Sequence, residues 1–184
     1  MPPKIPDQGP TGFSIGGGAQ RTFLVDKYKM QYEGLFDILD LYKLITEYFE
    51  EKGYDKRELV NAEMVNDNDE KFIELIIQPW KKLTDYAKSE IRVRIIMEDV
   101  KKVEIEKNGI KINAHHGKIF FTFDVYVDSD YEGRWGMTGN FALIRLLFER
   151  FFFSHLLKQA NAESINDFKT LVYQIKVFLN LTVN

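Results

Sequence analysis

Residues 91–95 read IRVRI and residues 119–128 read IFFTFDVYVD, and in both stretches apolar residues recur at every second position. A period of two is typical of a β-strand that buries one face and exposes the other. Arg92 and Arg94 then lie on the solvated face of the first strand. These two stretches predict a sheet with one apolar face and one polar face.

Further strands precede and join these two. Residues 59–65 and 71–77 flank the turn-rich residues 66–69, which predicts a hairpin. Pro79 ends the second of these strands because proline has no N–H to donate to a neighbouring strand. Asn108-Gly109 is the dipeptide that best suits a two-residue type I′ turn. The region from 58 to 128 is therefore expected to hold five or six antiparallel strands joined by short turns.

Helical periodicity lies on both sides of the strands. From residue 30 to residue 52 apolar residues recur at intervals of three and four, and Gly53 supplies a left-handed stop. After the strands, residues 141–158 and 165–179 each predict a helix, and Ser164 with Asp167 forms a capping box for the second. Their connection at 160–163 is short, so we expect the two to form a helical hairpin.

The predicted fold class is α+β: an N-terminal helix, an antiparallel β-meander of five or six strands, and a C-terminal helical hairpin packed on one sheet face. This order of elements resembles that of helix-grip folds, which hold apolar ligands. The resemblance is one of element order alone, and a fold does not fix a function.

The composition is that of an ordinary globular domain. The chain has 184 residues, 25 Lys+Arg against 28 Asp+Glu, 45% hydrophobic residues and no cysteine. These values exclude wholesale disorder and a disulfide scaffold. Without cysteine there is no thiol nucleophile and no thiolate metal site. The length predicts one domain, residues 29–184, preceded by a flexible Pro/Gly-rich arm, residues 1–28.

Two features predict a cytoplasmic protein. The first 28 residues lack the succession of charged, apolar and small residues that marks a signal peptide. The longest apolar stretch, residues 141–157, is interrupted by Arg145, Glu149, Arg150 and His155, and each charge at a bilayer centre is unfavourable by a few kcal/mol. We therefore expect no membrane span.

The segment 141–158 is apolar around almost its whole helical circumference. Such a helix must be buried on more than one side. Three partners could bury it: the sheet and last helix of the same chain, a second subunit, or an apolar ligand. On the subunit alternative, Phe148 and Phe152 are candidate contact residues.

Two other segments are candidate contact sites. The arm carries Phe13 and Ile15, which either dock on a neighbouring subunit or belong to a frayed terminus. The glycine-rich stretch after the last strand carries Tyr131, Arg134 and Trp135, residue types enriched at binding hot spots. The alternative for Trp135 is that it folds back over the sheet edge.

The residues offer little catalytic chemistry. His115 and His116 are adjacent and are expected in a solvated turn, and no serine lies in a nucleophile elbow. Asp128, Asp130 and His116 are the best candidates for a divalent-metal-dependent enzyme, but their spacing matches no calcium loop. We therefore assign no catalytic residue, no metal ligand and no cofactor.

The overall charge argues against a nucleic-acid surface. Lys88, Arg92 and Arg94 share one strand face, and Phe120 and Tyr126 would be placed to stack on bases. The net charge of −3 opposes this, because phosphate contacts supply most of such affinity.

The sequence thus favours a non-enzymatic structural or protein-interaction subunit, one of a homomeric or larger assembly. The alternative is a domain of helix-grip type that binds an apolar small molecule. A divalent-metal-dependent enzyme ranks below both.

Overall fold

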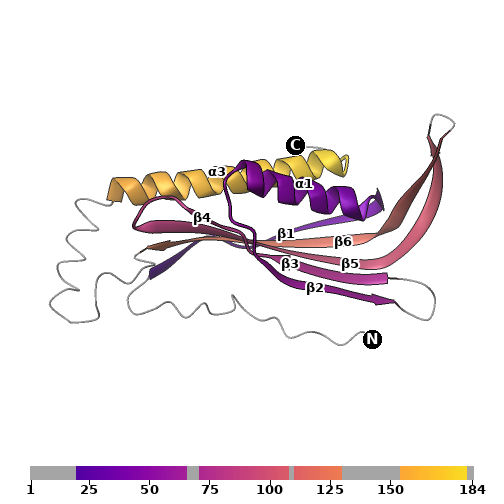
Figure 1. The fold of residues 1–184 in the computed structure, drawn as a ribbon, viewed down its shortest axis with the longest axis horizontal. Helices are drawn as coiled ribbons and strands as arrows, with labels where there is room; N and C mark the ends of the chain where they lie inside the picture. Colours follow the sequence, from indigo (N-terminus) through magenta and orange to yellow (C-terminus); the bar gives the residue numbers. More distant parts are fainter. Residues whose placement is uncertain (1–19, 66–70, 108–109, 130–153, 182–184) are drawn as a thin grey trace.

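The computed structural model describes residues 20–65, 71–107, 110–129 and 154–181. Within these ranges six strands form one antiparallel sheet, and two helices lie side by side on the same face of it (Figure 1). The elements are β1 (Gln20–Phe36), α1 (Ile38–Glu51), β2 (Glu58–Val65), β3 (Lys71–Ile77), β4 (Trp80–Lys82), β5 (Ala87–Lys107), β6 (Ile110–Ser129) and α3 (Ser154–Phe178).

The sheet is organised around its two longest strands. The strand order is β1-β6-β5-β3-β2, with β4 paired to β5 beyond the end of β3. β5 and β6 pair from Ala87↔Ser129 to Lys107↔Ile110. The predicted antiparallel sheet is confirmed, as are the hairpin of β2 with β3 and the end of β3 before Pro79.

The β5–β6 ladder contains one irregularity, which lies between Glu98 and Lys101. Asp99 adopts a positive φ of 56° there, so β5 carries a bulge. Gly117 of β6 lies against this bulge, and a Cβ at that position would come within 2.9 Å of the Glu98 carbonyl oxygen. The hairpin beyond this point curves toward the helix side of the sheet (Figure 1). The bulge and the missing Cβ together allow this close approach.

The core lies between the sheet and the two helices. The apolar residues at alternate positions of β5 and β6 are fully buried, as the period of two predicts. They meet the apolar stripes of both helices: Ile91, Val93, Ile95, Ile119, Phe121, Phe123 and Val125 of the sheet, Leu41 and Ile45 of α1, and Leu171 and Ile175 of α3. Each such side chain contributes about 1.5–3 kcal/mol through its removal from water.

Helix α1 has well-formed ends. The Asp37 carboxylate accepts hydrogen bonds from the backbone N–H groups of Leu39 and Asp40, which caps the first turn. At the other end Gly53 has a φ of 74°, and its N–H donates to the carbonyl of Glu50. The predicted left-handed stop at Gly53 is confirmed.

The prediction of an N-terminal helix as the first element is wrong. Strand β1 comes first and takes in residues 20–36, which include 20–28 of the expected arm and the start of the helix predicted from 30. Tyr28, Met30 and Tyr32 face the core side while the residues between them are exposed. This alternation overlaps the helical pattern of α1, and the cap at Asp37 separates the two elements.

The predicted helical hairpin is also wrong. α3 is a single helix that continues through residues 160–163, where we expected a turn. Ser164, expected to cap a second helix, instead donates from Oγ to the carbonyl of Ala160 at 2.9 Å within the helix. Residues 141–153 of the other predicted helix lie outside the described residues. Neither helix of the described ranges is long and apolar enough to cross a membrane.

We expect Gly117→Ala to lower the free energy of unfolding by about 1–3 kcal/mol, because the added methyl group meets backbone atoms that have little room to move. Urea denaturation followed by circular dichroism measures this change. The matched control is Gly53→Asn, where a Cβ meets no atom within 4 Å and asparagine tolerates a positive φ. Equal effects at the two positions would contradict the role assigned to Gly117.

Candidate functional site

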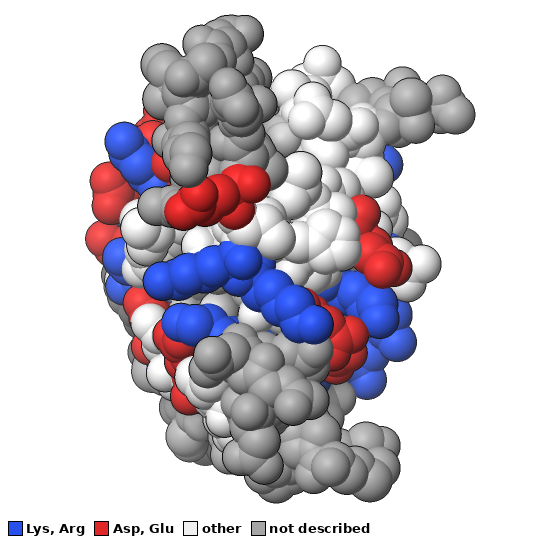
Figure 2. Space-filling view, turned by 90° about the vertical axis from the view of Figure 1, so that its right-hand side faces the viewer, with Lys and Arg blue, Asp and Glu red and all other residues white. Residues whose placement is uncertain are grey.

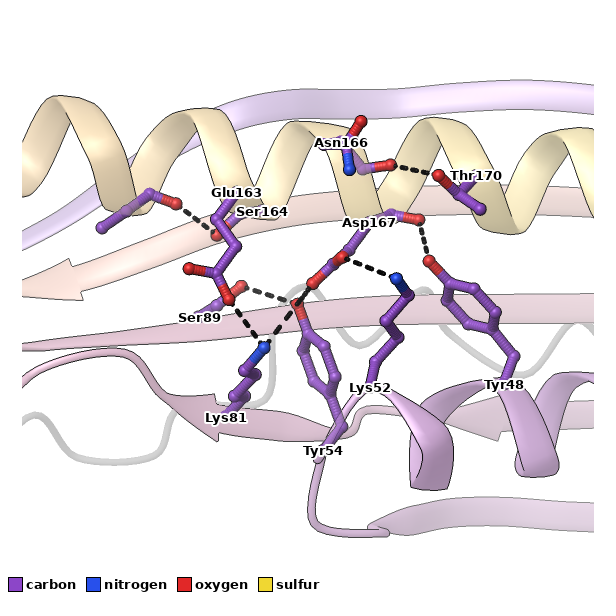
Figure 3. Close-up of polar contacts among 11 residues, drawn as sticks. Tyr48, Lys52, Tyr54, Lys81, Ser89, Glu163, Ser164, Asn166, Asp167 and Thr170 are labelled. Carbon is purple, nitrogen blue, oxygen red and sulfur yellow. Dashed lines mark hydrogen bonds and ion pairs between the residues drawn. The ribbon is translucent and has the colours of Figure 1, made fainter.

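The helix side of the sheet holds a buried polar cluster around Asp167 (Figure 3). Asp167 is 4% exposed, and α3 directs it toward the end of α1 and the start of β5. The Tyr54 hydroxyl donates to Asp167 Oδ2 at 3.1 Å and lies 3.3 Å from Ser89 Oγ. The Tyr48 hydroxyl donates to the backbone carbonyl of Asp167 at 2.7 Å. These contacts join α3 to α1 and to the sheet.

Two lysines neutralise this carboxylate from a greater distance. Lys52 Nζ lies 3.9 Å from Asp167 Oδ1, and Lys81 Nζ lies 4.0 Å from Oδ2. Lys81 makes its shorter contact, 2.7 Å, with Glu163. Burial raises the pKa of Asp167, and it outweighs the opposing effects of the Tyr54 hydrogen bond and the two lysines.

The cluster is built to hold elements together rather than to transfer protons. Burial raises the pKa of Tyr48 and of Tyr54 well above the ordinary value, so both hydroxyls keep their protons and serve as donors. The hydrogen bonds of both tyrosine hydroxyls are therefore made to Asp167 of the same chain. We interpret the cluster as a polar joint between α3 and α1.

The outer face of the sheet carries a second polar network. Arg21 of β1 binds Asp128 of β6 through two hydrogen bonds of 2.7 and 2.8 Å, and its guanidinium lies over the Tyr126 ring at 3.8 Å. Lys88 and Glu90 of β5 extend this network. Glu90 and Asp128 are each 2% exposed. Burial acts to raise the pKa of Glu90, but hydrogen bonds from Lys88 and Gln78 hold it below its usual value.

The same pattern continues along the sheet. Arg92 lies 3.8 Å from Asp124, and Arg94 lies 2.8 Å from Glu74. Both acids are buried. The row of positive side chains on β5 is therefore matched by acids on its neighbours, β6 and β3. Sequence analysis found the basic row and missed the pairing, although Arg92 and Asp124 occupy facing positions once β5 and β6 are aligned.

The predicted contact residues are not tested by this geometry. All seven lie outside the described residues: Phe13, Ile15, Tyr131, Arg134, Trp135, Phe148 and Phe152. Asp130 lies outside them as well. These residues stay predictions.

The residues considered for metal chemistry do not come together. Asp128 and His116 lie near opposite ends of β6, about 40 Å apart along a strand at ~3.3 Å per residue. The described part of the chain contains no group of three potential ligands for a metal ion. His115 and His116 lie within β6 and not in the expected turn, and the His115 ring packs beside Phe36.

Four of the five residues considered for nucleic acid, all but the partly exposed Phe120, are also occupied. Tyr126 is fully buried and therefore has no face for a base. Lys88, Arg92 and Arg94 make the ion pairs described above. At the end of the molecule shown in Figure 2, basic side chains alternate with acidic ones. Two ion pairs, Lys71–Glu63 and Lys118–Asp99, belong to that half of the sheet.

A small pocket opens beside the last turn of α1. Its apolar floor is formed by Phe49, Tyr54, Ile77 and Pro79, and polar residues Thr46, Glu50, Lys56 and Arg57 complete the lining. The empty space is about 270 Å³, part of which is open to solvent. Its enclosed part has room for about one water molecule.

The described sheet has two edge strands, β1 and β2, and β1 is the longer of them. β1 pairs with β6 on one side, and among the described strands none pairs with its other side. Phe23, Tyr28 and Leu35 are 50%, 37% and 47% exposed along it. A strand of 17 residues with a free edge offers a row of backbone donors and acceptors to another chain.

Comparison of the chain with protein-family models, with curated proteins and with solved structures finds no match in any of the three.

We expect Tyr54→Phe to lower the free energy of unfolding by about 1–3 kcal/mol, because it removes a donor from a buried carboxylate. The matched control is Tyr42→Phe, which removes an exposed hydrogen bond to Glu58 and should change stability by less than about 0.5 kcal/mol. Urea denaturation at neutral pH measures both. Equal effects would contradict the role of Asp167 as a joint.

Asp167→Asn is expected to gain stability relative to the parent protein as the pH rises above ~4. The Asp167 carboxyl has a higher pKa in the folded chain than in the unfolded chain, so it binds its proton more tightly when the chain is folded. Its protonation therefore contributes to the free energy of unfolding at pH values below the unfolded pKa. That contribution is lost as the pH rises through the folded pKa. Urea denaturation of both proteins at intervals from about pH 3 to pH 7 measures the difference. A difference that does not change with pH would contradict this account.

Proposed function

We propose that the chain is a non-enzymatic structural or protein-interaction subunit of a homomeric or larger assembly. The observation that supports this most directly is the edge of β1 that no other described strand pairs with, together with its exposed aromatic and aliphatic side chains. Free edges are a recognised hazard for a sheet protein, because they template pairing with other chains. A long edge of this kind is consistent with a subunit that pairs through it.

The packing of the interior weighs against the alternative, a domain that encloses an apolar ligand. In a helix-grip arrangement the ligand would lie between the sheet and the long helix. Here aromatic side chains occupy that space: Phe121 and Phe123 stack at 5.9 Å, and Phe123 meets Phe168 of α3 at 5.7 Å. All three are 7% exposed or less.

The polar networks weigh against an enzyme. Asp167 is tied to tyrosines and lysines, and the acids of the outer face are tied to arginines and lysines. A general acid or base must be free to meet a substrate. Because these charged side chains pair with one another, they contribute to the stability of the fold and are not available to a substrate.

Three predicted contact segments remain part of this proposal on sequence grounds. The arm supplies Phe13 and Ile15, and the Phe-rich segment supplies Phe148 and Phe152. The stretch around Trp135 adds the residue types that dominate binding energy at interfaces. In this proposal they make contacts that supplement those of the β1 edge.

The full chain is expected to sediment as a dimer or larger species at tens of micromolar concentration. Analytical ultracentrifugation over a range of concentrations measures this. A chain that stays monomeric throughout the range would contradict the proposed function. Native mass spectrometry of the same sample provides the control, since a co-purified apolar small molecule would favour the ligand-binding alternative.

A further inference from the structure

The free edge of β1 has a regular half and an irregular half. From Tyr28 to Phe36 the strand pairs with β6 in unbroken register. Before Tyr28 the register shifts twice, and Lys27 has a positive φ of 51°. Bulges of this kind twist an edge and disfavour the addition of a further strand to it. Only the half from Tyr28 onward therefore presents a straight edge for another strand.

The side chains of this regular half divide between the two faces of the sheet. Tyr28, Met30 and Tyr32 face the helices and pack against the core or its aromatic residues. Lys29 and Glu33 lie on the outer face, with Gln31 between them, and all three are exposed. Glu33 faces Lys118 of β6, whose positive charge attracts it, and Lys29 faces the uncharged Thr122. Two opposite charges therefore lie along the edge at equal distances from Gln31.

This arrangement is complementary to itself. In an antiparallel pair of identical strands related by a two-fold axis at Gln31, each residue faces the one at the same distance on the other side of the axis. Lys29 then faces Glu33 of the second copy, and Glu33 faces Lys29. Opposite charges at facing positions stabilise a strand pair. Gln31 faces its own counterpart, where two amides are able to hydrogen bond.

The helix-facing side is complementary in the same register. Tyr28 faces Gly34 of the second copy, and the Tyr32 ring of that copy lies over this glycine, so the two tyrosine rings would meet there. Met30 faces Tyr32, an apolar pair of the kind that stabilises sheets. Tyr28 is already 37% exposed, so this contact would remove apolar surface from water.

Other registers are less favourable. The side-chain alternation of a strand permits shifts by two residues and forbids shifts by one, which would place opposite faces together. One allowed shift places Lys29 opposite Leu35 and removes both ion pairs. The other places Glu33 opposite Lys27, the residue with positive φ in the irregular half.

We infer that two copies of this chain associate through antiparallel pairing of their β1 strands, with the two-fold axis at Gln31, and that the two sheets form one continuous sheet. This inference depends on the proposed function and names the partner as a second copy. The contact is isologous, as expected of a two-fold dimer.

Charge reversal tests the register. Lys29→Glu or Glu33→Lys places like charges opposite each other twice in the dimer, so each single variant should raise the dimer dissociation constant at least tenfold. The double variant Lys29→Glu with Glu33→Lys restores both opposite-charge pairs and should restore association. Lys169→Glu, on the exposed face of α3, is the matched control and should leave association unchanged. Sedimentation measures the dissociation constant, and circular dichroism checks the fold of each variant.

A disulfide tests the two-fold axis independently. The chain contains no cysteine, so Gln31→Cys introduces a single thiol. Facing residues of antiparallel strands have Cα atoms about 4.5–5.5 Å apart, within the range that a disulfide spans. Mild oxidation should convert Gln31→Cys to a covalent dimer and leave Lys169→Cys monomeric on a non-reducing gel.

The outcomes separate the two proposals. A monomeric parent protein would overturn both. An oligomeric parent whose association is insensitive to the single charge reversals, or in which Gln31→Cys fails to cross-link, would overturn the β1 pairing alone and leave the proposed function standing. Association lost in each single variant, regained in the double variant and accompanied by the cross-link would support the pairing.

Discussion

The antiparallel pairing of β5 with β6 is the interaction on which the rest of the structure depends. It is the longest ladder of the sheet, and β1, β3 and β4 all pair with one of these two strands. Because side chains alternate along a strand, this one register assigns every residue of both strands to the core or to the outer face. The helices cover one face, and the charged residues lie on the other.

The two faces are stabilised in different ways. On the helix side, aromatic and branched side chains fill the space between the layers, and the Asp167 cluster fixes α3 against α1. On the outer side, ion pairs such as Arg21–Asp128 are shielded from water. A buried ion pair contributes little net stability, but removing one partner is unfavourable by about 3–5 kcal/mol. Such pairs make the register of the strands specific, since a shift would leave buried charges without partners.

Sequence reasoning succeeded where the pattern was local and unambiguous. The alternation in β5 and β6, the hairpin of β2 with β3 and the stop at Gly53 were all correct, because each depends on a few adjacent residues. It failed at β1, whose alternation is broken by two bulges and runs directly into the helical pattern of α1. It also failed at Ser164, because a serine three residues before an acidic one resembles a helix cap when the neighbouring elements are unknown.

The sequence by itself determined an antiparallel sheet with one apolar and one charged face, because period and turn chemistry act over a few residues. Only the tertiary structure decided that Asp167 is buried and that Arg92 meets Asp124, since these contacts join elements far apart in the chain. It also decided that β1 lies at an edge among the described strands. The position of a strand in a sheet depends on which strands compete to pair with it, and no local pattern encodes the outcome of that competition.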